Sequence, residues 1–249
     1  MAVVTAGTSG EPHTLRAELV AAARTLGVIT AVGVVCGWLV VGVLSRLMML
    51  LLAVLNPVAT GVTSDDGFVM GQFTVSGSLN LLVVGTGFGV LGAGLYAALR
   101  GLAIGRRWFR LLSLSVGAGV VVGSQIVHSD GVDFRLLNPL WLAVGIFVLL
   151  PAVYVALLSA VSERLLSRAR PVPRPVVVLG LAAWVVVFLL LPLLAVLTAG
   201  FVVLRLTDRT GPGHRWVSSP AGPWLLRAGL AVLFVLAVAD IATEVTQLT

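Results

Sequence analysis

Long apolar stretches separated by clusters of arginine recur from Leu26 to Val245 and leave little of the chain for anything else. Hydrophobic residues make up 59% of the 249 residues and charged residues only 10%, whereas about a quarter of a typical soluble domain is charged. A helix needs about 20 apolar residues to cross the hydrocarbon core of a bilayer. The sequence therefore predicts an all-α integral membrane protein.

The lengths of the apolar stretches predict a bundle of six transmembrane helices joined by short loops. Residues 1–15 are polar and are expected to form a disordered cytoplasmic tail, so that residues 16–249 form one transmembrane domain. The connections are too short to bury a soluble core of their own. The predicted spans are residues 26–55, 78–99, 109–127, 140–161, 176–206 and 224–245.

The fifth apolar stretch allows two interpretations, because Pro192 lies near its middle. It is either one long kinked helix that crosses the membrane or two half-helices that form a re-entrant hairpin. Proline is tolerated within spanning helices, and residues 207–223 have the polar, Gly/Pro-rich character of an external connection. The sequence favours the kinked helix and leaves the hairpin as the alternative.

The arginines predict the orientation of the bundle. Connections 100–110 and 162–175 are rich in arginine, whereas loops 56–77 and 129–139 carry only Arg135. The positive-inside rule places the arginine-rich connections in the cytoplasm, and six spans then place both termini there. Arg209 and Arg215, in the last predicted external loop, run against this assignment. The expected location is the bacterial plasma membrane.

The net charge of +6 does not indicate nucleic-acid binding. All sixteen basic residues are arginines, and most lie at the ends of apolar stretches. A nucleic-acid interface would need a basic face with stacking aromatic residues. The lipid bilayer and another membrane subunit are the expected partners.

Glycines recur at four-residue spacing in three of the predicted helices. In a bilayer such pairs allow two helix backbones to approach closely, so they predict helix contacts within the bundle, with dimerisation as the alternative. The third helix also carries Gly117 and several serines and is expected to be the most enclosed. The pairs are Gly33 with Gly37, Gly85 with Gly89, and Gly119 with Gly123.

The first two predicted external loops hold four of the eight acidic residues that lie outside the predicted spans. Imidazole and carboxylate groups suit a divalent cation, which is the one cofactor that the sequence indicates. Asp-Gly pairs are also common turn formers, and the first loop has the pattern of a short hairpin. The residues of this predicted polar site are Asp65, Asp66, His128, Asp130 and Asp133.

Asp240 and Glu244 share one face of the last helix at a four-residue interval. Carboxylates within a membrane are costly and therefore invite a functional interpretation. The orientation above places these two near the cytoplasmic end, close to many arginines. They are interpreted as partners of structural ion pairs, with proton relay as the alternative.

Three segments resemble an uncharacterised group of multi-pass membrane proteins from high-GC bacteria. They are GVTSDDGF (61–68), HSDGVDF (128–134) and WLAVGIFVLLP (141–151). The resemblance implies a multi-pass membrane fold and brings no activity, substrate or site residue with it.

Three functions follow as hypotheses. The first is a non-enzymatic accessory or scaffold subunit, because no soluble domain and no nucleotide-binding loop, zinc-protease motif or nucleophile elbow is present. The second is a small solute or ion transporter or channel, based on the glycine-rich helices and acidic loops. The third is an enzyme acting on a lipid or envelope precursor at the extracytoplasmic face, with His128 as general base.

Overall fold

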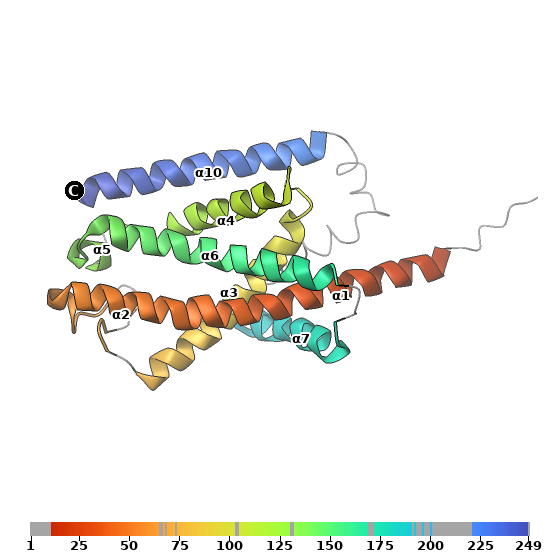
Figure 1. Cartoon of the computed structure of the whole chain (residues 1–249), viewed down its shortest axis with the longest axis horizontal. Helices are drawn as coiled ribbons and strands as arrows, with labels where there is room; N and C mark the ends of the chain where they lie inside the picture. The colour runs from red at the N-terminus through yellow and green to blue at the C-terminus, as the bar shows by residue number, and fades with distance from the viewer. Residues whose placement is uncertain are drawn as a thin grey trace, which may run out of the picture.

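The computed structural model describes residues 11–64, 67, 69–72, 74–102, 105–129, 132–168, 172–190, 192, 196, 200 and 221–248. The described part is helical, as the sequence predicts, and most of its helices lie side by side along one direction (Figure 1). The longer helices are α1 (Glu11–Gly37), α2 (Ser45–Leu55), α3 (Val75–Leu99), α4 (Arg107–Gly123), α6 (Leu140–Leu166), α7 (Arg174–Leu190) and α10 (Ala221–Leu248).

Four helical segments are long and apolar enough to cross a membrane. Both α4 and α7 are shorter, at 17 residues each, or about 26 Å at 1.5 Å per residue. The membrane class of the protein thus rests on four helices, and the count of six spans stays a prediction. The four segments are Leu19–Leu55, Val75–Leu99, Leu140–Leu166 and Pro223–Leu248.

The first helix is longer than predicted. A π-helical segment, Trp38–Leu44, joins α1 to α2, so that the chain is helical from Glu11 to Leu55. The last five residues of the predicted disordered tail are therefore helical, and residues 1–10 lie outside the described part. The apolar segment of 37 residues would reach about 55 Å, and the start of α1 projects beyond the bundle (Figure 1).

Glycines bring the backbones of α1 and α3 into contact. A methyl group placed on Gly89 would lie 2.6 Å from the carbonyl oxygen of Gly33, and one on Gly85 would lie 2.9 Å from that of Gly37. These distances are shorter than a van der Waals contact, so a larger residue would push the helices apart. The pairing is antiparallel, because residue numbers rise along α1 as they fall along α3.

The centre of the bundle lies between α1, α3 and α6. Ile29, Ala93 and Leu158 are fully buried there. The third predicted span, which corresponds to α4, is not the most enclosed helix. Its Trp108 is 62% exposed, and a methyl group on Gly117 would touch nothing within 4 Å. The glycines of α4 lie on different sides of the helix. Gly119 and Gly123 contact a neighbouring helix, whereas Gly117 does not.

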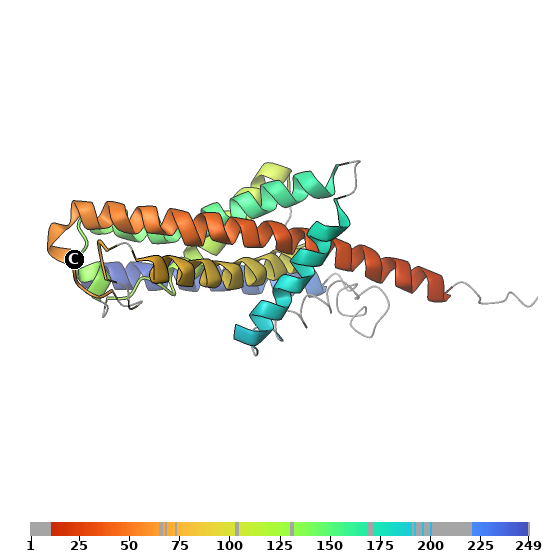
Figure 2. The ribbon, with the colours of Figure 1, turned by 90° about the horizontal axis from the view of Figure 1, so that it is seen from below.

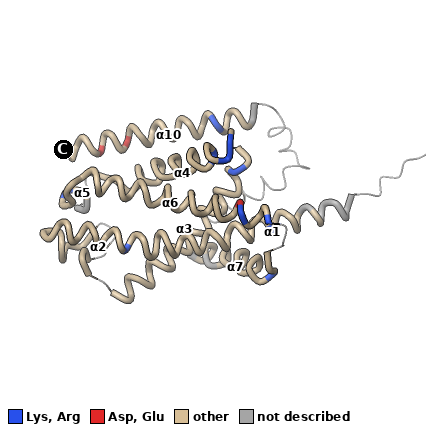
Figure 3. The backbone as a smooth tube through the Cα atoms, viewed as in Figure 1, with Lys and Arg blue, Asp and Glu red and all other residues tan. Residues whose placement is uncertain are grey.

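That neighbour is α6. A methyl group on Gly119 would lie 2.6 Å from the carbonyl oxygen of Val148 and 2.9 Å from the side chain of Ala152, and Gly123 also faces Val148. The two helices run antiparallel, which brings the start of α4 beside the end of α6. This end of the bundle, where α3 and α6 end and α4 begins, is called the arginine-rich end below, and the opposite end is called the loop end (Figure 3).

The last helix runs in the opposite direction from the predicted one. Arg227 Nε, near the start of α10, donates a hydrogen bond of 2.9 Å to the carbonyl of Leu102 at the arginine-rich end. Glu244, near its other end, accepts a hydrogen bond from the backbone N–H of Ser129 at the loop end. The described chain therefore starts at the arginine-rich end and finishes at the loop end, which contradicts the prediction that both termini share a side.

The helix before α10 also begins at the arginine-rich end. Near its start α7 lies against α1, where Gly180 meets Gly27 and a methyl group on Gly27 would lie 2.8 Å from Val177 Cγ1, and it crosses the bundle obliquely (Figure 2). Both α7 and α10 thus begin at the arginine-rich end. The choice between a single kinked crossing by residues 176–206 and the hairpin alternative stays a prediction, because the described part of this segment is α7 and three single residues. Most of residues 191–220 lie outside the described part.

The first loop contains the short hairpin that its sequence pattern indicates. Gly61 N–H donates to the carbonyl of Met70 at 3.0 Å, and Met70 N–H donates to Val62 at 2.9 Å. One antiparallel bridge pairs Thr63 with Val69. The loop end therefore carries a turn of defined geometry directly before α3.

Candidate functional site

The residues of the predicted loop-end polar site lie mostly outside the described part of the chain. Asp65, Asp66 and Asp130 are not described, and Asp133 lies in α5 (Val132–Leu136) without a described side chain. His128 is exposed in the stretch between α4 and α5. Among the described residues, no three His, Cys, Asp or Glu side chains come together as metal ligands would. The divalent-cation site stays a prediction.

The stretch after α4 is instead seen to hold the end of α10. Besides the bond from Ser129 N–H to Glu244, the Ser129 hydroxyl donates to Gln247 Oε1 at 2.6 Å. Arg135 Nε donates to the carbonyl of Ser129 at 2.8 Å. The interpretation of Glu244 as a partner of cytoplasmic arginines is wrong, because the arginine-rich connections lie at the other end of the molecule.

A buried amide links the two loops. Asn56, which the sequence pattern marks only as the end of the first helix, is 7% exposed. Its Nδ2 donates to the carbonyl of Leu52 at 2.9 Å, and its Oδ1 accepts from the backbone N–H of Asn138 at 2.7 Å. Both ends of the amide are satisfied, so Asn56 joins α2 to the start of α6.

The surface of α10 is almost entirely exposed. Only 6% of its most apolar 18-residue window is buried, and α4 is the helix against which it packs most. Asp240 is exposed on this helix, one turn before Glu244. Figure 3 shows the acidic positions on α10 near the C-terminus, far from the arginines gathered at the other end.

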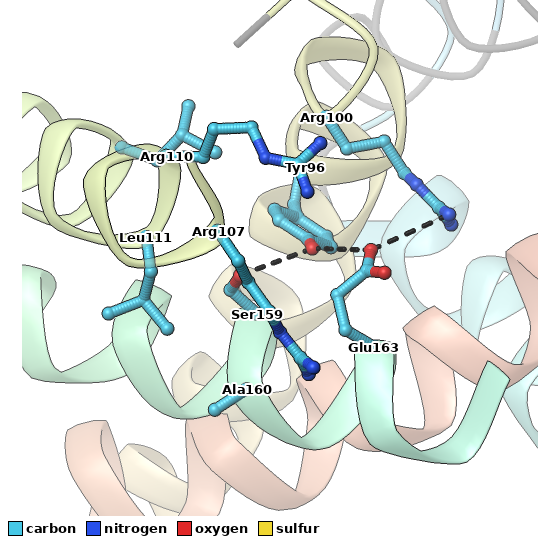
Figure 4. Close-up of a pocket in the computed structure, with 9 residues that line it drawn as sticks. Tyr96, Arg100, Arg107, Arg110, Leu111, Ser159, Ala160 and Glu163 are labelled. Atoms are coloured by element: carbon cyan, nitrogen blue, oxygen red, sulfur yellow. Dashed lines mark hydrogen bonds and ion pairs between the residues drawn. The ribbon is translucent and has the colours of Figure 1, made fainter. Parts of the chain in front are cut away.

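The arginine-rich end contains a polar network between α3 and α6 (Figure 4). The Tyr96 hydroxyl donates to Glu163 Oε1 at 3.0 Å and lies 3.2 Å from the hydroxyl of Ser159. Arg100 forms an ion pair with the same carboxylate, with 3.5 Å between Nη2 and Oε1. The Tyr96 ring is buried, while Arg100 and Glu163 are each about one third exposed. The network thus joins the interior of the bundle to its surface.

Two hollows adjoin this network. The smaller, of about 30 Å³, lies between the network and Arg107 and Arg110 of α4 (Figure 4), and a hollow of this size holds one or two water molecules. The larger is an open groove of about 860 Å³ between α4 and α6, called the arginine groove below. Four of the residues that line it are Arg106, Arg107, Arg164 and Arg168.

Sequence reasoning assigned these arginines to membrane orientation and did not find the network. The available signal was the four-residue interval between Ser159 and Glu163, which places two polar groups on one face of a helix. Their partner Tyr96 lies 63 and 67 residues earlier in the chain. Nothing in the local sequence of α6 indicates that α3, rather than lipid, faces this pair.

Comparison of the chain with protein-family models, with curated proteins and with solved structures finds no match.

Proposed function

We propose that this protein is a non-enzymatic accessory or scaffold subunit of a bacterial plasma-membrane assembly and that it binds its partner along α10. The arginine-rich end faces the cytoplasm, as the positive-inside rule requires, and the loop end faces outward. The observation that carries the proposal is the exposed carboxylate of Asp240, which follows the long apolar stretch of α10.

The argument for a partner is the free-energy cost of placing the Asp240 carboxylate in the membrane. Asp240 makes no hydrogen bond or ion pair with any described residue, and Leu236 and Val238 beside it are 62% and 44% exposed. Glu244 is held by Ser129, and Asp240 lies one turn, or about 6 Å, further into the helix. An aspartate at the centre of a spanning helix costs roughly 3 kcal/mol and less toward its end, and a partner that binds it removes this cost.

The side chains of α10 indicate what kind of helix would bind it. A helix that carries an arginine, a lysine or a hydrogen-bond donor at the level of Asp240 would satisfy the carboxylate. The remaining contact would be made by the apolar side chains of α10. A single polar group inside an apolar contact sets the register of two helices, in the way that buried polar groups do in coiled coils.

The transporter hypothesis has less support from the geometry. Conduction needs a polar path across the hydrophobic core. The glycine contacts of α1 with α3 and of α4 with α6 bring helix backbones together and leave no room for such a path between these pairs. The enzyme hypothesis depends on His128 and on carboxylates outside the described part.

Purification from native membranes in a mild detergent tests the proposal. The wild-type protein should co-purify with one other membrane protein in a fixed stoichiometry. Asp240→Leu should abolish this co-purification, because the apolar replacement has nothing for the partner to bind, while Asp240→Glu should retain it. Leu236→Ile, one turn earlier on the same helix, serves as the matched control and should also retain the partner.

Two results would refute the proposal. A wild-type protein that is a clean monomer or homo-oligomer has no partner subunit. A partner that remains bound to Asp240→Leu in full amount binds elsewhere. Thermal melting of each variant should show that Asp240→Leu is folded, since its side chain faces outward and its replacement creates no cavity.

A further inference from the structure

We infer that the arginine groove binds the headgroup of an anionic phospholipid. The inference is independent of the partner of α10, because the groove lies between α4 and α6 at the arginine-rich end. It rests on the charge, the local helix geometry and the apolar border of the groove.

The charge of the groove is uncompensated among the residues that line it. Four guanidinium groups, at the start of α4 and at or just after the end of α6, share a hollow of about 860 Å³, and its lining contains no acidic residue. The ion pair between Arg100 and Glu163 lies outside it. Like charges in one groove repel one another, and an anion between them turns this repulsion into attraction. Guanidinium groups bind phosphate through two parallel hydrogen bonds.

The positions of the arginines relative to the two helix ends favour a binding groove over simple helix capping. The C-terminal end of α6 carries a partial negative charge, which accounts for a favourable position of Arg164 and Arg168 near it. It does not account for Arg106 and Arg107, which stand at the N-terminal end of α4, where a helix favours negative charge. No side chain caps this end, so its first N–H groups have no intrahelical partner. A phosphate bound there accepts hydrogen bonds both from the arginine side chains and from the free N–H groups at the start of α4.

The apolar border of the groove points to a lipid rather than to a free anion. Trp108, 62% exposed, and Leu112, 51% exposed, belong to the lining together with the four arginines. The exposed surface of α4 continues past Leu112 to Val116, which is 43% exposed. A free phosphate would use the arginines alone. A phospholipid places its phosphate among them and its acyl chains along this apolar surface, as in basic pockets at the cytoplasmic face of other membrane proteins.

Lipid binding by the purified full-length protein in neutral detergent tests the inference. Native mass spectrometry and thermal melting are measured with phosphatidylglycerol and with phosphatidylcholine. The double variant R106Q/R164Q removes one arginine from each side of the groove. The control R24Q/R174Q removes the same charge from exposed positions near the arginine-rich end but outside the groove. Free glycerol phosphate is added as a competitor in a separate series.

The wild-type protein should retain phosphatidylglycerol in preference to phosphatidylcholine. R106Q/R164Q should weaken this binding by about 30-fold, at about fivefold per arginine near an anionic headgroup, whereas R24Q/R174Q should stay within about twofold of the wild type. Equal retention of the two lipids would overturn the inference, as would an equal loss in both double variants. Displacement of the lipid by glycerol phosphate at the same concentration would show a site for free anions instead.

Discussion

Glu244 near the end of α10 accepts a hydrogen bond from the backbone N–H of Ser129, in the stretch that follows α4. At the other end of the same helix, Arg227 donates to the carbonyl of Leu102 just after α3. The two bonds fix the direction of α10. Because α4 also runs from the arginine-rich end to the loop end, α4 and α10 are parallel neighbours and the chain returns between them.

This direction predicts the accessibility of the two ends of the molecule. Single cysteines are introduced at Gln247, Thr60 and Ser167 in a Cys36→Ser background. Gln247 and Thr60 should react with a membrane-impermeant maleimide from one face and Ser167 from the other, since the first two lie at the loop end and the third follows α6. Reaction of Gln247 and Ser167 from one face would restore the arrangement with both termini on the same side.

The contact between α1 and α3 predicts opposite effects of two alanine substitutions in one helix. Gly89→Ala should lower the free energy of unfolding by about 1 to 3 kcal/mol, because its methyl group would meet the backbone of Gly33. Gly87→Ala is the control: a methyl group there meets nothing within 4 Å, and alanine should stabilise the helix by about 0.5 to 1 kcal/mol. Unfolding in mixed micelles measures both, and effects of the same sign would contradict this contact.

A second pair of substitutions tests the packing of α4 on α6. Gly119→Leu should destabilise the protein by about 1 to 3 kcal/mol through overpacking against Val148 and Ala152. Gly117→Leu faces open space on the same helix and should change stability by no more than about 0.5 kcal/mol. The melting temperatures of the two variants in detergent measure this difference in stability. An unchanged melting temperature of Gly119→Leu would mean that this face contacts lipid.

The polar network at the arginine-rich end predicts the effect of one hydroxyl group. Tyr96→Phe should lower stability by about 1 to 2 kcal/mol, because it leaves Ser159 without this partner and weakens the anchoring of Glu163. Ser113→Ala removes an exposed hydroxyl that bonds only to the carbonyl of Arg110 and should have little effect. Equal melting temperatures of the two variants would show that the network contributes no net stability.

Two of the helices could be predicted from local sequence to within about five residues. The predicted span 78–99 corresponds to α3, which covers Val75–Leu99, and the span 140–161 corresponds to α6, which covers Leu140–Leu166. A run of apolar residues between polar ends determines a membrane helix regardless of its neighbours, because the bilayer itself satisfies the apolar surface. The length and position of such a helix are therefore properties of the segment.

Helix direction depends on information outside each segment. The apolar residues of α10 do not indicate its direction, whereas Arg209 and Arg215, which precede it in the sequence, favour a start at the arginine-rich end. A single crossing by residues 176–206, which the sequence favours, predicts the opposite direction. The direction became visible only through bonds between residues more than 100 positions apart, Arg227 with Leu102 and Glu244 with Ser129.

The candidate sites divide in the same way. The sequence by itself determined that arginines gather in two connections and that carboxylates stand on the last helix. The tertiary structure decided that Arg106 and Arg164 share one groove, that Gly119 meets a helix while Gly117 does not, and that Tyr96 reaches Glu163. Composition and spacing are local, whereas a groove, a close backbone contact or a hydrogen-bond network exists only when packing brings distant segments together.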